Sequence, residues 1–374
     1  MTIGITGMAM KSSLGDTLDE CYSAMCKIKD GNAPLRAFDS DKYNAKHSYE
    51  IDDRENGEDR PYRASDWLTD VVKEAANNSQ VDFNKKRCGV FVGTGLRELR
   101  SVELWHTQNQ SIELDRLHFG PACNQGLNVK IPVYTFCNAC SASNFTLGIA
   151  MDMLEDDSLD AAIVCGIDSI TESMFGLLDR VNPMNPQALR SLNKDRRGVV
   201  MGEGAAAVVL EKSPSGPSIT LRGVGMSCDA YQDTAPHKDG LVAAMKDAGT
   251  RSGVTPDEID MLVVHGTGTI LNDEVEMLAV REYFGDNLGN LNITGLKPNI
   301  GHTSGASGLI STIIASKSLI EGSAPPIYGL HDPIELTEGM QLLSELESTD
   351  TVNNVQINAF GFGGVNAVVI VSRS

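Results

Sequence analysis

The chain has 374 residues, of which 41% are hydrophobic and 22% charged, as in a globular protein with one double-sized domain or two ordinary ones. Its formal net charge of -19 argues against a nucleic-acid-binding protein and leaves no general basic surface for anionic membranes. An acidic partner protein therefore needs a local group of basic residues.

The sequence shows neither a targeting signal nor a cysteine pattern that indicates a function. The first seven residues lack the basic and apolar regions of a signal peptide, and residues 308–320 are interrupted by polar side chains, as in a buried helix. The eight cysteines show neither paired metal-ligand spacing nor a disulfide framework, so we expect reduced thiols and a cytoplasmic protein. Cys137 and Cys140 form a C-x-x-C sequence, but no second pair supports a redox or zinc site.

Short apolar runs alternate with helical patterns along the chain. Phe145, Ile149 and Met153 recur at helical spacing and predict a helix over residues 143–155. Alternating strands and helices indicate an α/β fold. Strands are predicted over residues 90–92, 131–136, 161–164, 205–210, 261–264 and 367–371.

The two halves of the chain end alike. A glycine-rich sequence precedes the strand predicted at 205–210 and also the one at 367–371, and the Ser/Pro/Gly-rich segment 213–217 resembles a linker. We therefore expect a duplicated fold, with halves at 1–213 and 218–374. Two further segments are less regular: 40–65 is expected to be a polar surface excursion, and 96–130 has no clear pattern.

Cys140 lies between a predicted strand and a predicted helix, in Asn138-Ala139-Cys140-Ser141. At this place the positive end of the helix stabilises a thiolate, and backbone N–H groups of the turn can face a carbonyl oxygen. A lone cysteine here is more often a small buried residue. Two histidine motifs elsewhere favour the catalytic interpretation.

The first histidine opens His265-Gly266-Thr267-Gly268-Thr269, and the second lies in Lys297-Pro298-Asn299-Ile300-Gly301-His302. The glycines allow a substrate close to the backbone, and the threonine hydroxyls can bind a polar ligand. Two neutral imidazoles beside a thiol can donate hydrogen bonds to a developing negative charge. Together with Cys140, His265 and His302 predict thiol-based acyl chemistry.

These motifs, taken with Gly202-Glu203-Gly204 and the segment Asn358-Ala359-Phe360-Gly361-Phe362-Gly363-Gly364, give the chain a resemblance to the β-ketoacyl synthases. These are the condensing enzymes of fatty-acid and polyketide assembly. The matches run in the expected order over nearly the whole chain. The resemblance implies a thiolase-like fold, in which two pseudo-duplicated halves form a five-layered α-β-α-β-α sandwich. The N-terminal half carries Cys140, and the C-terminal half carries His265 and His302.

The resemblance also implies catalytic roles. Cys140 takes an acyl group from a carrier thioester, and His265 and His302 promote decarboxylation of a malonyl-type extender, whose carbanion then attacks the acyl-cysteine. Lys297 orients and polarises the histidines, although a lysine is more often a solvated surface charge. Glu276 is a structural acid, with a helix-surface carboxylate as the alternative.

Other residues of the resemblance shape the substrate site. Phe362, flanked by Gly361 and Gly363, is expected to gate the pocket, and its backbone N–H joins that of Cys140 as an oxyanion hole. The further substrate-binding residues are Thr267 and Thr269, expected to hold the phosphopantetheine arm, and Phe360.

The resemblance further implies an acidic acyl carrier protein as partner, which needs basic residues near the tunnel mouth. The candidates are Arg190, Arg60 and Arg63. We expect a homodimer or a heterodimer with a homologous subunit. No metal, nucleotide or other bound cofactor is expected, because the phosphopantetheine arm arrives on the carrier.

Some residues depart from the family pattern. Asn138 replaces a usual threonine, Ser141 is more typical of polyketide condensing domains, and Asn272 replaces a usual glycine. These changes favour a discrete polyketide or specialised fatty-acid pathway. Two alternatives remain open: an acyltransferase that passes the acyl group to an alcohol or amine, and a non-catalytic partner subunit, against which the presence of Cys140 argues. A degradative thiolase is disfavoured, since no cysteine follows Cys228.

Overall fold

The computed structural model describes residues 2–182, 184–214 and 219–374, so most of the linker predicted at 213–217 lies outside the described residues. The strands form one large sheet of 11 strands, with two small two-stranded sheets beside it. No helix within the described part of the chain is both long and apolar enough to cross a membrane.

The large sheet consists of two half-sheets with the same topology. When the five main strands of each half are numbered along the chain, their order from the outer edge inwards is third, second, fourth, fifth and first. The third, second and fourth strands pair in parallel, and the fifth is antiparallel to both the fourth and the first. The duplication expected from the sequence is therefore present in strand order and in strand direction. The N-terminal half contains β1 (Ile3–Ser12), β4 (Cys88–Gly93), β5 (Val133–Phe136), β6 (Ala161–Asp168) and β7 (Gly204–Lys212). The C-terminal half contains β8 (Ile219–Cys228), β9 (Met261–Val263), β10 (Asn292–Thr294), β14 (Asn354–Gly361) and β15 (Val365–Arg373), with β12 (Gln341–Leu342) added at its edge.

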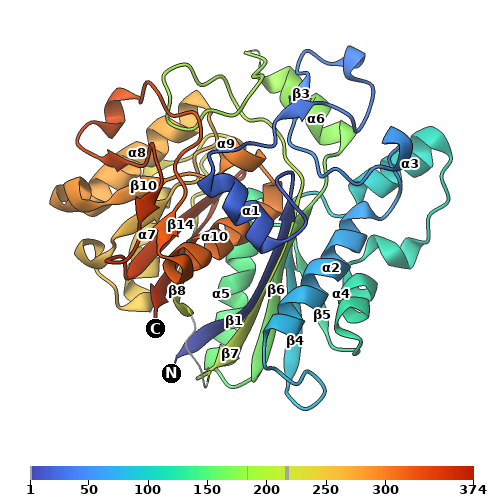
Figure 1. The fold of residues 1–374 in the computed structure, drawn as a ribbon, viewed down its shortest axis with the longest axis horizontal. Helices are drawn as coiled ribbons and strands as arrows, with labels where there is room; N and C mark the ends of the chain where they lie inside the picture. Colours follow the sequence, from blue (N-terminus) through green and yellow to red (C-terminus); the bar gives the residue numbers. More distant parts are fainter. Residues whose placement is uncertain (1, 183, 215–218) are drawn as a thin grey trace.

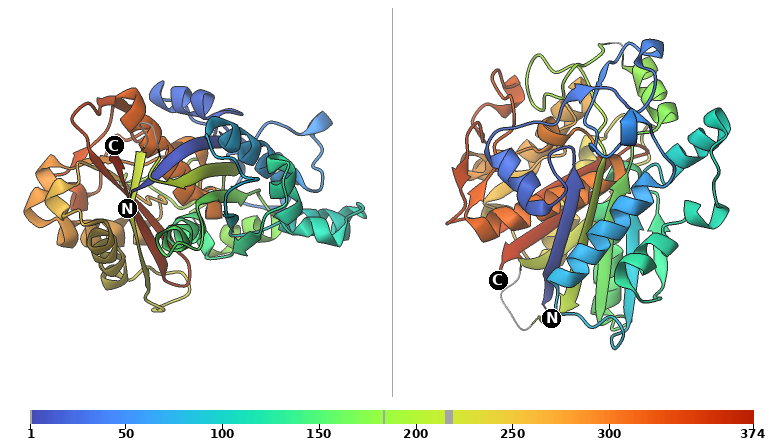
Figure 2. Two further views of the ribbon diagram at one scale, coloured as in Figure 1. Left: turned by 90° about the horizontal axis from the view of Figure 1, so that it is seen from below. Right: turned by 45° about the vertical axis from the view of Figure 1, so that its right-hand side comes forward.

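Helices form three layers around the two half-sheets (Figures 1 and 2). Two helices, α5 (Ala142–Glu155) and α10 (Ser307–Glu321), contact each other and strands of both halves, so they lie in the middle layer. The outer face of the N-terminal half-sheet is covered by α2 and α4, and that of the C-terminal half-sheet by α7 and α8. The five-layered α-β-α-β-α sandwich is thus confirmed. The outer helices are α2 (Arg63–Asn78), α4 (Gly120–Leu127), α7 (Lys238–Ser252) and α8 (Ile270–Phe284).

Small residues let the middle layer pack closely. A Cβ atom on Gly308 of α10 would lie 2.4 Å from the Asn144 side chain of α5, and one on Gly93 of β4 would lie 2.5 Å from the Ser143 nitrogen. Neither position can therefore take a larger residue without movement. This is the reason for the glycine- and serine-rich sequence after His302. Both central helices are almost wholly buried, as residues 308–320 predicted.

The segment expected to be a surface excursion is partly buried. Arg54 and Arg63 both form ion pairs with Glu203, at 3.2 and 3.1 Å, and their side chains are 4% and 2% exposed. Asp59 pairs with Arg63 at 3.1 Å. The polar composition of residues 40–65 reflects this internal charge network as well as solvent contact, which corrects the sequence-based expectation. Other elements are α1 (Leu18–Cys26), α3 (Leu99–Gln108), α6 (Glu172–Val181), α9 (Lys297–Ile300), β2 (Ala33–Pro34), β3 (His47–Ser48), β11 (Ser323–Ala324) and β13 (Glu347–Ser348).

Candidate active site

Cys140 lies in a short 3₁₀ turn, Ala139–Ser141, between the end of β5 and the start of α5. Ala139 has φ = 49°, a left-handed conformation that non-glycine residues seldom adopt. Such local strain is common where a side chain must be presented at a functional site. The first residues of α5, which directly follow the turn, pack closely on Gly93 of β4.

His302 lies just before the equivalent turn of the C-terminal half, in which Gly305 corresponds to Cys140. It follows β10 and α9 and precedes a 3₁₀ turn, Ser304–Ala306, that leads into α10. Ser304 has φ = 47°, matching the conformation of Ala139. The His302 N–H donates to the Val200 oxygen at 2.8 Å, and the Gly202 N–H donates to the His302 oxygen at 3.0 Å. The Gly-Glu-Gly segment of the sequence therefore holds the backbone of this histidine.

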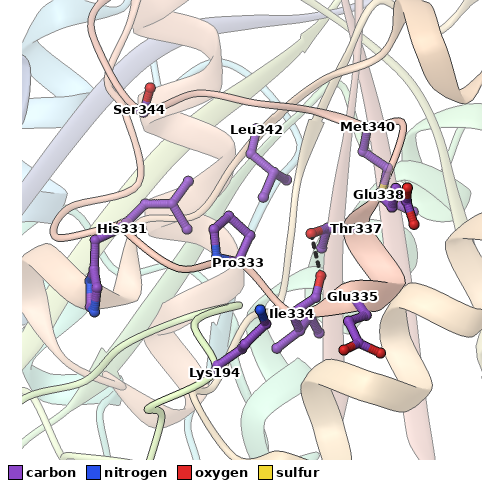
Figure 3. Close-up of a pocket in the computed structure, with 11 residues that line it drawn as sticks. Lys194, His331, Pro333, Ile334, Glu335, Thr337, Glu338, Met340, Leu342 and Ser344 are labelled. Carbon is purple, nitrogen blue, oxygen red and sulfur yellow. Dashed lines mark hydrogen bonds between the residues drawn. The ribbon is translucent and has the colours of Figure 1, made fainter.

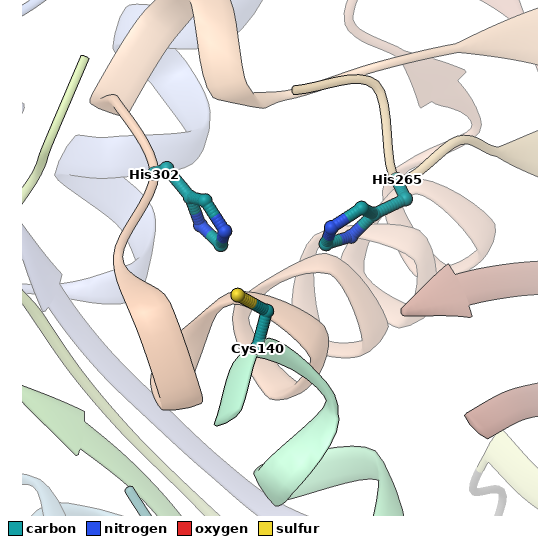
Figure 4. A group of neighbouring side chains, drawn as sticks. All are labelled: Cys140, His265 and His302. Atoms are coloured by element: carbon teal, nitrogen blue, oxygen red, sulfur yellow. The ribbon is translucent and has the colours of Figure 1, made fainter. Parts of the chain in front are cut away.

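The structure brings the three predicted reactive groups together. The Cys140 sulfur and one ring nitrogen each of His265 and His302 lie within 4.8 Å of one another. The two rings are nearly perpendicular, with centroids 5.5 Å apart, and the sulfur points into the space between them (Figure 4). A thiol and two imidazoles also make a ligand set that zinc accepts. The chemistry inferred from the sequence uses no metal.

Lys297 sets the state of His265. Its side chain is buried, its Nζ lies 3.2 Å from His265 Nδ1, and it also donates to the His265 carbonyl oxygen. Because an ammonium group only donates, Nδ1 is the acceptor, and the proton of the neutral imidazole is on Nε2. His265 can therefore offer an N–H donor to a substrate.

Glu276 holds the backbone turn at His265 through hydrogen bonds. Its carboxylate accepts hydrogen bonds from the His265 and Gly266 N–H groups at 2.7 and 2.8 Å and from Asn358 at 3.1 Å. The side chain is fully buried, so Glu276 is not a helix-surface carboxylate. Burial raises its pKa, while Lys297 opposes the shift as a nearby positive charge.

Both histidines are neutral at physiological pH. Burial lowers the pKa of His265 and His302 well below the usual value, and the charge of Lys297 lowers both further. Neither ring nitrogen of His302 has a protein hydrogen-bond partner within the described structure, although both are buried. Such unpartnered nitrogens are available to a ligand.

The Cys140 sulfur is a thiol at rest. Burial raises the pKa of Cys140 to about 11, although the charge of Lys297 and the backbone N–H groups of Phe362 and Cys140 lower it. The effect of burial thus outweighs these stabilising groups, whereas the sequence predicted a stabilised thiolate. The thiol must therefore lose its proton as the sulfur attacks. The same two N–H groups can face a carbonyl oxygen bound at the sulfur.

The Phe362 loop connects β14 to β15 beside Cys140. Phe362 is 45% exposed and lines the cavity above the sulfur. Gly361 packs against the Asn138 carbonyl oxygen and Ser141, where a Cβ would be 3.2 Å from either. Gly363 has φ = 83°, which favours glycine, and its N–H donates to the Asp233 oxygen at 2.8 Å.

A cavity of about 470 Å³ leads from Cys140 to the surface. Thr267 and Thr269 line it, with their hydroxyl oxygens 3.0 Å apart, and Phe360 lines it at 5.8 Å from the His265 ring centre. Its other walls are mainly apolar. They include Leu96, Met174, Leu178, Val181, Met184, Val199, Met201, Ile270 and Leu271.

A second hollow, of about 480 Å³, lies elsewhere on the C-terminal half and shares no lining residue with the first (Figure 3). It is formed mainly by residues 330–344. Its basic side chains already have acidic partners: Lys194 lies 3.0 Å from Asp332, and His331 lies 3.5 Å from Asp195. Its described lining residues include no cysteine.

Asp168, at the end of β6, was not identified from the sequence. Its carboxylate accepts hydrogen bonds from the Thr94 hydroxyl at 2.7 Å and from the N–H groups of Gly95, Leu96 and Gly305 at 2.6–2.8 Å. It therefore joins the N-terminal half to the loop that carries His302. A single polar residue at the end of a wholly buried strand is the signal that could have identified it.

We expect Asp168→Asn to lower the free energy of unfolding by about 2–4 kcal/mol, because the new amide directs N–H groups at backbone N–H donors in a buried place. Condensing activity should fall with it, since Gly305 is no longer held. Urea denaturation gives the stability change. The matched control is Asp152→Asn on the exposed face of α5, which breaks only an exposed ion pair with Arg251 and should change stability by less than about 0.5 kcal/mol. Equal effects of the two substitutions contradict the assignment.

The activity should also depend on Lys297 through pH. Burial lowers the pKa of Lys297 to about 8, so the ammonium is lost as the pH rises through this value. We expect the rate of condensation from pre-acylated enzyme to fall above about pH 8. The same shift makes the free energy of unfolding rise between about pH 8 and 10.5, because the unfolded chain binds the additional proton there. Both trends should be absent in Lys297→Met, and their persistence excludes this lysine as their source.

The arginines proposed for carrier docking differ in position. Arg63 is 2% exposed and pairs with Asp53, Asp59 and Glu203, so it cannot contact a carrier, and the prediction for this residue is wrong. Its burial reflects the charge network described above. The side chains of Arg60 and Arg190 are 43% and 44% exposed, and each pairs with one aspartate. These two remain candidates.

Comparison with known proteins gives the family. Residues 1–215 match the model of the β-ketoacyl synthase N-terminal domain, and residues 219–331 match that of the C-terminal domain. The chain belongs to the β-ketoacyl synthase family. It is 26% identical over 405 residues to 3-oxoacyl-[acyl-carrier-protein] synthase 2 of Coxiella burnetii, covering 99% of this chain and 98% of that protein. All eight cysteines of this ketosynthase are free.

Two further proteins are similar to this chain. Nodulation protein E of Rhizobium leguminosarum bv. trifolii is 31% identical over 255 residues, covering 65% of this chain and 62% of that protein. The solved ishigamide ketosynthase/chain length factor superposes with a TM-score of 0.89 at 25% identity, covering 100% of this ketosynthase and 99% of that chain.

Proposed function

We propose that this ketosynthase performs a decarboxylative Claisen condensation through an acyl-cysteine at Cys140, in a discrete polyketide or specialised fatty-acid pathway. The observation that carries the proposal is the convergence of the Cys140 sulfur and two neutral imidazoles within 4.8 Å. A non-catalytic subunit needs neither the nucleophile nor the buried Lys297 that sets the tautomer of His265.

In the first half-reaction the Cys140 sulfur attacks the carbonyl carbon of a carrier thioester. The carbon–sulfur bond to the carrier breaks, its thiol leaves with the proton that Cys140 loses, and the acyl group remains on Cys140. The carbonyl oxygen becomes negative in the tetrahedral intermediate. The N–H groups of Phe362 and Cys140, which already act on the sulfur, are placed to stabilise it.

In the second half-reaction a malonyl-type thioester loses CO₂, and its electrons pass to the thioester carbonyl as an enolate. His265 and His302 are neutral donors and can stabilise the enolate oxygen. The enolate carbon then attacks the acyl carbonyl, which forms the carbon–carbon bond and releases the Cys140 thiolate. Lys297 and Glu276 act through His265 by fixing its ring and backbone.

The substrates enter through the cavity that ends at Cys140. Thr267 and Thr269 present hydroxyl groups to it and fit the polar amides of a phosphopantetheine arm, while its apolar walls fit an acyl chain. We infer an acyl carrier protein as the donor, supported by the name of the Coxiella relative, with Arg60 and Arg190 as docking candidates. No bound cofactor is required by this chemistry, and a cytoplasmic location suits it.

We also propose a dimer, with a second copy or a homologous subunit at the edge of the N-terminal half-sheet. β5 is the outermost strand there, and its Tyr134 is 46% exposed. An exposed edge strand is a ready pairing surface, and this one leads directly to Cys140. The similarity to the solved ishigamide ketosynthase/chain length factor supports a heterodimer as one form.

The test is intact-mass spectrometry of the enzyme after incubation with a panel of acyl-carrier thioesters and a malonyl-carrier protein. We expect an acyl mass on the enzyme and a 3-ketoacyl product on the carrier. Acylation followed by transfer to an added alcohol or amine, with no ketoacyl product, supports an acyltransferase instead. An enzyme that accepts no acyl group overturns the proposal.

A further inference from the structure

Arg197 is the one charged side chain among the described residues that line the Cys140 cavity. It is exposed, and within the described structure its guanidinium has no hydrogen bond to protein and no carboxylate within ion-pair distance. By contrast, the neighbouring residues Arg190, Lys194 and Arg196 all pair with carboxylates.

The backbone at Arg197 is held firmly beside the threonine-rich turn. Arg196 is buried, and its guanidinium donates to the Asn193 oxygen at 3.0 Å and to Glu274 at 2.9 Å. On the other side, the Gly198 N–H donates to the Gly268 oxygen at 2.9 Å. Arg197 is therefore fixed next to Thr267 and Thr269, on the path a thioester substrate must take.

The surroundings of Arg197 explain why an anion should be attracted to it. The nearby cavity walls are apolar, and the cavity contains no acidic side chain among its described lining residues. A cleft with apolar walls and charge of one sign focuses the electrostatic field on an incoming ion of the opposite sign. A guanidinium also presents paired N–H donors that match the oxygens of a phosphate or carboxylate.

We propose that Arg197 binds an anionic oxygen group carried by the incoming thioester, and so selects substrates at the cavity mouth. The group has two sources: the phosphate of the phosphopantetheine arm, or a carboxylate on the acyl chain. The inference rests on the proposed function, because it takes the substrate to be a thioester that acylates Cys140.

The test uses small thioesters, so that carrier docking plays no part. One pair compares an acyl-pantetheine with the same acyl-phosphopantetheine, and a second compares a neutral acyl-pantetheine with one that ends in a carboxylate. The rate of Cys140 acylation against substrate concentration is measured by intact mass. We expect the wild type to favour the anionic member of one pair, through a lower KM, on the order of 10- to 100-fold.

Arg197→Gln should remove this preference while leaving the rate with the neutral substrates nearly unchanged, and Arg197→Lys should keep part of it. The control is Arg222→Gln, an exposed arginine on β8 that does not line the cavity and should keep the full preference. The pair that responds identifies the source of the anion. Wild-type enzyme that is acylated equally by both members of each pair, or an Arg197→Gln variant that keeps the preference, overturns the inference. Absence of acylation by every thioester contradicts the proposed function itself.

Discussion

Cys140→Ala is expected to accept no acyl group and to lose condensing activity by on the order of 10⁴-fold or more, because no other cysteine is among the described residues that line the cavity. The variant should fold normally. Cys140 has a small side chain, and the α5 residues that follow its turn pack on Gly93, so alanine fits with little change in packing. Intact mass after incubation with acyl thioesters checks the acylation directly.

Cys140→Ser tests the same assignment more finely. A serine hydroxyl has nearly the same shape but is a far weaker nucleophile without a strong base, so acylation should be very slow but still directed to residue 140. Peptide mapping locates the acyl group. Acyl transfer at the wild-type rate in either variant contradicts the role of Cys140. Acylation of Cys137, the exposed cysteine of the C-x-x-C sequence, also contradicts the role of Cys140.

His302→Ala is expected to separate the two half-reactions. Acylation of Cys140 should fall by less than about 10-fold, whereas condensation with a malonyl thioester should fall by on the order of 10²- to 10⁴-fold. The reason is the unpartnered state of the His302 ring, whose nitrogens have no role in holding the protein together among the described contacts. Their hydrogen bonds are therefore available to the enolate.

Single-turnover measurements test this division. Enzyme acylated beforehand is mixed with malonyl thioester, and the release of CO₂ and the ketoacyl product are followed separately. His302→Gln is the matched control, because its side-chain amide can still donate a hydrogen bond and should recover part of the rate. If His302→Ala slows acylation as much as condensation, its main role is proton transfer from the Cys140 thiol.

The sequence supported the overall fold because apolar strands and glycine-rich turns are local signals. The run at 161–164 predicted β6, and the pattern at 143–155 predicted α5 almost to its ends. β1 and β8, which join the two halves, were not predicted, because Gly4, Gly7, Gly223 and Gly225 interrupt their apolar patterns. Those glycines have a tertiary cause: a Cβ on Gly225 would lie 2.1 Å from the Ala248 nitrogen of α7.

The reactive groups were predictable, but their electrostatic setting was not. Local motifs pointed to Cys140, His265 and His302, and the structure places them together. The clamp at Asp168 and the internal pairing of Arg63 depend on partners 137 and 140 residues away in sequence. No local pattern carries that information, and for this reason Arg63 resembled a free surface arginine.

Because the Cys140 turn and the turn that follows His302 come from different halves of the chain, activity depends on how the two halves are positioned relative to each other. Both halves contribute turns to the reactive centre, and these turns are held together by the hydrogen bond from the Gly305 N–H to Asp168 and by the packing of α5 against α10. A slight separation of the halves inactivates the protein while each half-sheet and its outer helices remain intact. Catalytic activity should therefore be lost under milder denaturing conditions than helix content. Under heat or denaturant, turnover should disappear before circular dichroism changes.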